Sequence, residues 1–200
     1  MIVDRLFPTT ITVSDDVLEE KYIETIKHDI NKISRYTHCT DAVRSEIWQS
    51  NYHPETLTNR VLELSKEYID ELKYEFEEHY ITDMWYNVLK PGETHRPHTH
   101  SNNLVSGVFY LQSNDDSPAI TFIDPRPQTT VLQPQQKEYT KDNSTTWQVP
   151  TKVNRMVLFP SWLQHYVPKN DSNDDRISVS FNVMLRGQVG RSENFQSNRF

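Results

Sequence analysis

The residues best suited to chemistry lie in one short stretch and one distant segment. His98 and His100 are two positions apart, and His165 follows much later in the chain. In an extended strand successive side chains point to opposite faces, so this spacing aims the imidazoles of His98 and His100 the same way. A third nitrogen from His165 would complete a set of three ligands. Such a set leaves coordination positions open on a metal ion, which is typical of reactive centres and not of closed structural ones.

Two further features belong to this chemistry. The segment around His165, from Leu158 to Val167, is strand-like but interrupted by a Pro-Ser turn. His95 lies close to the first pair of histidines, but Pro97 separates it from their strand. We therefore expect His95 to contact a substrate, or to contact a metal ligand without binding the metal itself.

Length and composition exclude several classes of protein. At 200 residues the chain is expected to form a single domain, residues 1–200, with a core of its own. Its single cysteine, Cys39, excludes an intrachain disulfide and favours a reducing, cytoplasmic setting. No apolar stretch approaches bilayer length, so no membrane partner is expected. The net charge of −7 argues against sequence-independent binding of nucleic acid.

The pattern along the chain divides it into helical support, a barrel and a tail. Ser14 is placed to cap a first helix, and a polar connection over 37–54 leads to a second one, so residues 14–80 are expected to be mainly helical. The apolar stripes of these helices comprise Leu18, Tyr22, Ile26, Ile30 and Ile33 in the first and Val61, Leu64, Tyr68, Leu72 and Phe76 in the second.

Short runs rich in β-branched and aromatic residues follow from Ile81. They predict strands over 84–89, 104–111, 119–123, 153–159 and 177–184, with a long loop from Pro125 to Thr146. Helices first and strands afterwards indicate an α+β chain that is mainly β, with a jelly-roll barrel at about 81–186 and an irregular tail at 187–200. The length of the loop favours a lid or a substrate-binding loop.

Several motifs in order resemble one family. They are Leu6-Phe7-Pro8, Trp85-Tyr86-Asn87, Pro91-Gly92, His98-Thr99-His100, Ser106 to Leu111, Asp124-Pro125-Arg126, Phe159-Pro160-Ser161, His165-Tyr166-Val167 and Arg176 to Asn182. The series resembles the iron(II)/2-oxoglutarate-dependent oxygenases, and within them a branch distantly similar to prolyl hydroxylases. The resemblance covers roughly the C-terminal half and implies a double-stranded β-helix, the cupin-like jelly roll of that superfamily.

The resemblance also implies roles for individual residues. His98 matches the first metal-binding histidine, and His165 the distal one. Arg176, eleven positions after His165, matches the basic residue that pairs with the far carboxylate of 2-oxoglutarate. A guanidinium suits this task because its planar fork binds a carboxylate through two parallel hydrogen bonds. Ser178, which shares the strand face of Arg176, and Tyr110 are expected to reach the same co-substrate.

His100 departs from the commoner pattern of the superfamily, in which Asp or Glu stands two residues after the first histidine. A carboxylate would lower the charge of the iron site by one unit, whereas a neutral imidazole does not. Histidine is frequent at this position in the branch, so His100 is assigned as the third ligand. Asp124 is the alternative carboxylate.

The resulting hypothesis is a non-haem Fe(II)- and 2-oxoglutarate-dependent dioxygenase that hydroxylates a second substrate and consumes O2. Two other readings stay open at this point. One is a three-histidine dioxygenase of cupin type that does not use 2-oxoglutarate, and the other is a jelly-roll binding module without catalysis.

Overall fold

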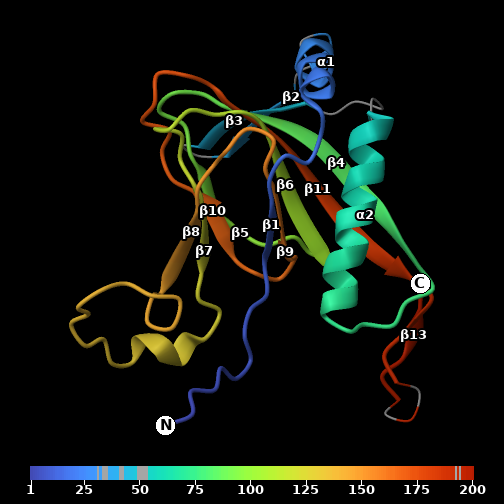
Figure 1. Cartoon of the computed structure of the whole chain (residues 1–200), viewed down its shortest axis with the longest axis vertical. Coiled ribbons are helices and arrows are strands. Elements are labelled where there is room, and N and C mark those ends of the chain that lie inside the picture. Colours follow the sequence, from blue (N-terminus) through green and yellow to red (C-terminus); the bar gives the residue numbers. More distant parts are fainter. Residues whose placement is uncertain (31, 33–35, 41–42, 49–53, 192, 194) are drawn as a thin grey trace.

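Two antiparallel sheets and two helices make up the fold of the computed structural model (Figure 1). The structure describes residues 1–30, 32, 36–40, 43–48, 54–191, 193 and 195–200, with the backbone alone for 36–48. The larger sheet has the order β1 (Thr12–Ser14), β9 (Met156–Pro160), β6 (Val105–Gln112), β11 (Arg176–Arg186), β4 (Glu78–Leu89), β3 (Val43–Trp48) and β2 (Tyr36–Thr40). The smaller sheet has the order β5 (His95–His98), β10 (His165–Val167), β7 (Ile120–Ile123) and β8 (Thr146–Val149). The predicted class, mainly β with helices near the N-terminus, is confirmed.

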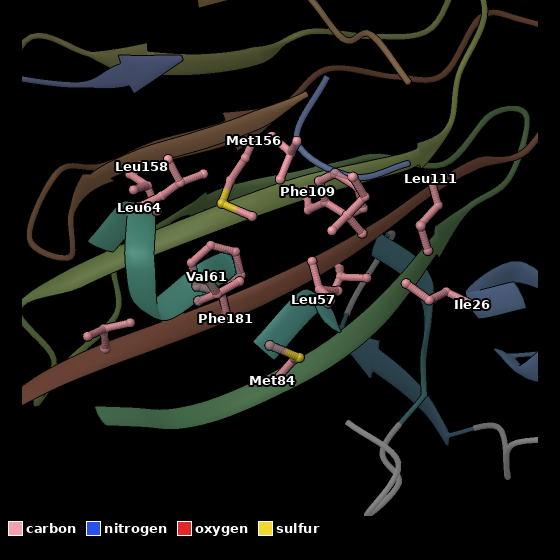
Figure 2. Packing of buried hydrophobic residues seen from close by; sticks show 14 of the residues in the cluster. Ile26, Leu57, Val61, Leu64, Met84, Phe109, Leu111, Met156, Leu158 and Phe181 are labelled. Atoms are coloured by element: carbon pink, nitrogen blue, oxygen red, sulfur yellow. The ribbon is translucent and has the colours of Figure 1, made fainter. Parts of the chain in front are cut away.

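The helices α1 (Glu20–Ile30) and α2 (Glu55–Glu71) cover one face of the larger sheet. Each helix buries an apolar stripe at helical spacing, which the sequence predicted in part. Leu18 and Leu72 of the predicted stripes lie outside the helices, and the buried stripes also include Ile23, Leu57 and Ile69. Figure 2 shows α2 side chains such as Val61 and Leu64 packed against Phe181 and Leu158 of the strands. This contact forms the main hydrophobic core of the chain.

A second core lies between the two sheets, and strand alternation separates it from the first. Along β6, Phe109 and Leu111 face the helices, whereas Val108 and Tyr110 belong to the cluster that also contains Phe122 of the smaller sheet. Because successive strand residues point to opposite faces, every second residue of β6 and β11 points into the space between the sheets. That space holds the candidate site.

The helical region differs from the prediction in three places. Ser14 does not cap a helix, because it lies in β1, paired with Met156, and α1 begins only at Glu20. The supposed polar connection over 37–54 contains the hairpin β2–β3, which adds two strands to the edge of the larger sheet. Phe76 packs against the core from beyond the end of α2, and Ile33 lies outside the described residues.

The predicted strands are present with shifted ends; the strand expected at His98 and the strand-like segment at His165 form the short β5 and β10, whereas β8 was missed. β5, β8 and β10 have three or four residues each and carry few consecutive apolar side chains. The polar segment after Pro125 is a loop between the paired strands β7 and β8, with one 3-10 turn, η1 (Pro127–Thr130). The tail forms a short hairpin of β12 (Gln188–Val189) with β13 (Asn198–Arg199). No helix among the described residues is long and apolar enough to cross a bilayer.

Gly107 is required where β6 passes the main core. A Cβ at this position would overlap the ring of Phe181 and lie 2.8 Å from a methyl of Leu158. We expect Gly107→Ala to lower the free energy of unfolding by about 1–3 kcal/mol through overpacking. The exposed strand residue Gln148 provides the control, because Gln148→Ala is expected to change stability by less than about 0.5 kcal/mol in the same urea titration. Equal stability of the two variants would contradict this account of the packing.

Candidate metal centre and buried arginine

The three histidines meet where the smaller sheet pairs β5 with β10. His98 and His165 are direct partners in this antiparallel pair. His100 lies two residues beyond the end of β5, and its backbone N–H donates to the carbonyl of Ser161 at 2.9 Å. The alternation argument therefore does not position His100. The turn after β9 positions it instead.

The geometry of the three rings suits one ion. Their ligand nitrogens all lie within 4.8 Å of one another, and the Nε2 atoms of His100 and His165 are 3.4 Å apart. Nitrogens bound to a common ion at about 2.1 Å lie about 3 Å apart, so only a small closure is needed. Among the described residues, no other group of three or more His, Cys, Asp or Glu side chains has this spacing.

Backbone carbonyls fix the tautomers of two of these rings. His98 Nδ1 is 2.8 Å from the carbonyl of Arg96, and His165 Nδ1 is 2.9 Å from that of Leu163. A carbonyl only accepts, so both Nδ1 atoms carry the proton. Each neutral ring then presents the lone pair of Nε2, which is the usual arrangement for a histidine that binds a metal.

Burial keeps two of the rings neutral. The pKa of His165 is lowered to about 3, mainly by burial and further by the positive charge that the neighbouring His98 can carry. The pKa of His100 is lowered to about 4 for the same reasons, with Asp83 opposing the shift. Protons therefore compete little with a metal ion for these two nitrogens near pH 7.

Aromatic rings and a buried hydroxyl network hold the cluster. Phe159 lies edge-on to His165, with ring centroids 4.7 Å apart, and Trp85 lies 5.7 Å from the ring of His100. Ser161, whose carbonyl binds His100, is itself held by a hydroxyl contact of 2.8 Å to Ser106. Ser161 belongs to the Phe-Pro-Ser motif but was assigned no role from the sequence. Its carbonyl, in the turn after β9, holds the backbone of His100 in place.

Arg176 lies deep between the sheets without an acidic partner among the described residues. Its side chain is 2% exposed, and its Nη1 donates to Ser178 Oγ at a long 3.5 Å. The guanidinium carbon lies 4.8 Å from the ring centre of Tyr110, which pairs with Ser178 across β6 and β11. Burial lowers the pKa of Arg176. A buried guanidinium without a carboxylate is costly, so the site favours an anionic ligand.

Unused hydrogen-bonding groups mark the same place. Arg176 Nε, Tyr110 OH and His95 Nε2 are enclosed and have no hydrogen-bond partner in the described part of the chain. Buried polar atoms are rarely left without a partner. A carboxylate fits this set, since its oxygens accept several N–H and O–H donors at once.

Asp124 does not join the cluster of histidines. Its carboxylate accepts from Arg126 Nε at 3.0 Å and Nη2 at 2.9 Å, and this neighbour lowers the pKa of Asp124. Asp124 is also absent from the set of ligand atoms that lie within reach of one ion. The alternative of Asp124 as the third ligand therefore finds no support in the structure.

Comparison with known proteins places this geometry in a family. The family model described as "Putative 2OG-Fe(II) oxygenase" matches residues 83–182, which contain all three histidines and Arg176. The chain belongs to this family. Fe(II) and 2-oxoglutarate are typical of these 2OG-Fe(II) oxygenases, and the histidine cluster of this member could hold the ion. No curated protein is similar enough in sequence to count as a relative of this oxygenase.

Solved structures share the fold of this 2OG-Fe(II) oxygenase at low sequence identity. The α-ketoglutarate-dependent epimerase SnoN from nogalamycin biosynthesis is 11% identical, with a TM-score of 0.68 over 92% of this chain and 82% of SnoN. A prolyl-4-hydroxylase from Pseudomonas putida is 15% identical, with a TM-score of 0.62 over 90% of this chain and 94% of its own. HygX from Streptomyces hygroscopicus, solved with nickel, 2-oxoglutarate and hygromycin B, is 11% identical, with a TM-score of 0.61 over 88% and 83%. The double-stranded β-helix expected from the sequence is thereby confirmed.

Metal binding should depend on each of the three histidines. We expect His98→Ala, His100→Ala and His165→Ala each to weaken the binding of Ni(II), used as a redox-stable ion, by at least about ten-fold in calorimetry. Asp124→Ala is the control and should leave the affinity unchanged, because Arg126 already occupies that carboxylate. A larger loss in Asp124→Ala than in His100→Ala would contradict the three-histidine set.

The metal-free protein should lose stability in mild acid. Burial holds the pKa of His95, His100 and His165 at about 3, 4 and 3 in the folded chain. An unfolded histidine titrates near about 6.5, so below that pH the unfolded state binds more protons and the free energy of unfolding falls. The slope approaches about 1.4 kcal/mol per pH unit for each histidine. Urea unfolding with a chelator at pH 7, 6 and 5 measures this pH dependence of the free energy of unfolding. His165→Gln should remove the contribution of one histidine to it. Constant stability over this range would contradict the burial of these rings as neutral groups.

Proposed function

We propose that this family member is an Fe(II)- and 2-oxoglutarate-dependent dioxygenase that hydroxylates a second substrate. The observation that carries the proposal is the buried guanidinium of Arg176, which has no anionic partner among the described residues. A dicarboxylate co-substrate supplies the missing anion. In the proposed complex its keto-acid end would bind the metal and its distal carboxylate would bind the arginine.

Three histidines would hold the iron in this proposal. His98, His100 and His165 present neutral nitrogens on one side of the ion, which leaves its other positions for 2-oxoglutarate and O2. The bound iron would supply the oxidising chemistry that no side chain of the chain can provide. The protein's own contribution is to orient the ligands and the co-substrate.

Arg176, Tyr110 and Ser178 would hold the co-substrate. The guanidinium offers a bidentate contact to the distal carboxylate, and the tyrosine hydroxyl is free to donate to it. The hydroxyl stays protonated, since burial raises the pKa of Tyr110 and the charge of Arg176 offsets this only in part. Ser178, beside Arg176 on β11, supports the guanidinium through its hydroxyl oxygen.

The second substrate would enter on the side of His98. His98 is exposed, whereas His165 is buried, so the cluster is accessible to solvent at His98. The loop between β7 and β8 carries the exposed apolar residues Val131, Leu132 and Tyr139. An ion pair of 3.0 Å joins Asp142 of this loop to Arg5 of the N-terminal segment. These features support a substrate-binding role for the loop, which would exclude water when occupied.

One observation favours a second candidate. The cluster contains histidines and no carboxylate, which also suits a three-histidine dioxygenase of cupin type that acts without 2-oxoglutarate. Oxygen consumption separates the two, because the proposed enzyme requires 2-oxoglutarate for turnover and the cupin type does not. A protein that binds metal but neither 2-oxoglutarate nor O2 would instead be a binding module.

Arg176 should determine co-substrate affinity and leave metal affinity unchanged. Loss of a hydrogen bond to a charged group costs about 1.5–3 kcal/mol, so Arg176→Ala should weaken 2-oxoglutarate binding by about ten- to a hundred-fold. Arg176→Lys keeps the charge but loses the fork and should fall between wild type and Arg176→Ala. An anaerobic titration of the Fe(II) protein with 2-oxoglutarate, followed by its charge-transfer absorption, gives the affinities. Normal affinity in Arg176→Ala would refute the proposed anchor.

A further inference from the structure

His95 is the one histidine near the metal cluster that the proposed function leaves without a task. It opens β5 and pairs with Val167 of β10, on the same two strands that bring His98 opposite His165. It does not belong to the set of ligand atoms that can share one ion. A role for His95 must therefore come from something other than coordination of the metal.

His95 is half-buried, and the Nε2 end of its ring is enclosed. This Nε2 atom has no hydrogen-bond partner in the described part of the chain. The pKa of His95 is lowered to about 3, mainly by burial and then by the positive charges of Arg176 and His98. The ring is therefore within range of the charges of both Arg176 and His98. An uncharged imidazole there can donate one hydrogen bond from Nε2–H without adding charge.

Three unpartnered polar groups thus belong to the buried region around Arg176. They are Arg176 Nε, Tyr110 OH and His95 Nε2, and they come from β11, β6 and β5 of the two facing sheets. Three enclosed polar groups without partners would each be unfavourable, but a single carboxylate can accept from all three. The set spans both sheets, so packing within either sheet does not explain it.

We propose that His95 is a co-substrate-binding residue whose Nε2–H donates to the carboxylate that Arg176 holds. This inference rests on the proposed function, because it assigns a further contact to the same 2-oxoglutarate. It adds a donor from the smaller sheet to an anchor otherwise built on β6 and β11. The distal carboxylate would then bridge the two sheets.

The test compares two ligands on Ni(II)-loaded protein by calorimetry without oxygen. 2-Oxoglutarate has the distal carboxylate, and 2-oxobutanoate keeps the keto-acid end but lacks it. His95→Leu removes the donor. We expect it to lower the affinity for 2-oxoglutarate by about ten-fold or more and to change the affinity for 2-oxobutanoate by less than about two-fold. His95→Gln, whose amide can donate from a similar place, should retain most of the affinity for 2-oxoglutarate.

Thr94→Val is the matched structural control. The hydroxyl of Thr94 donates to the carbonyl of Val167 at 2.7 Å, so its removal loosens β5 from β10 without touching the proposed contact. We expect it to leave the preference for 2-oxoglutarate over 2-oxobutanoate intact. The inference would be overturned if His95→Leu lowered the affinities for both ligands equally. It would also be overturned if His95→Leu kept the preference for 2-oxoglutarate, as Thr94→Val is expected to do.

The outcome for Arg176 separates this inference from the function on which it rests. Normal 2-oxoglutarate affinity in His95→Leu together with a loss in Arg176→Lys overturns the role of His95 alone. Failure of the wild-type protein to bind 2-oxoglutarate overturns the proposed function and the inference with it. If His95→Leu and Arg176→Lys both lose affinity for 2-oxoglutarate but not for 2-oxobutanoate, the result supports the proposed function and the inference.

Discussion

The alternation of side chains along β11 is the constraint on which the rest of the structure depends. Val179 and Phe181 point to the helices, so the residues that alternate with them along β11 must point into the space between the sheets. Those inward residues include Arg176, Ser178 and Asn182, all of them buried. The same eleven-pair register with β4 that fills the main core therefore also forces a charge, a hydroxyl and an amide into the interior. A shift of one residue would exchange the two faces, so the fold cannot keep its core and lose its polar site.

The sequence indicated which residues make up the candidate site better than it indicated how the fold positions them. His98, His165 and Arg176 could be recognised because their types and spacing are unusual, and strand alternation placed Ser178 beside Arg176. The position of His100 depends on a carbonyl of Ser161, and a contact across 61 residues of chain has no local signal. The hairpin β2–β3 was missed for a related reason, since its pairing with β4 is long-range and its residues lack a clean apolar alternation. The prediction of Ser14 as a helix cap failed because a good capping residue is equally able to end a strand at β1.

Electrostatics connects the histidine cluster to the arginine. Three neutral imidazoles add no negative charge to a bound Fe(II), whereas a site with a carboxylate would cancel one unit. Burial reinforces this state by holding the pKa of His100 and His165 far below neutrality. Arg176 adds a further buried positive charge. A site of this kind gains most from a ligand that brings two negative charges, and a dicarboxylate such as 2-oxoglutarate meets both positive centres at once. A neutral or monoanionic ligand would leave one of them uncompensated.

The two sides of the cluster differ in ways that suit different tasks. The inner wall, with Arg176 and Tyr110, is buried and built from the long strands β11 and β6, whereas the outer side carries the exposed His98 and the loop after β7. An epimerase and a hydroxylase share the fold of this chain at 11% and 15% identity, so the fold is compatible with more than one reaction. Under the proposed function, the closed wall would hold the co-substrate and the open side would select the second substrate. Specificity would then be changed through exposed loop residues such as Leu132 and Tyr139, whose replacement leaves both hydrophobic cores intact.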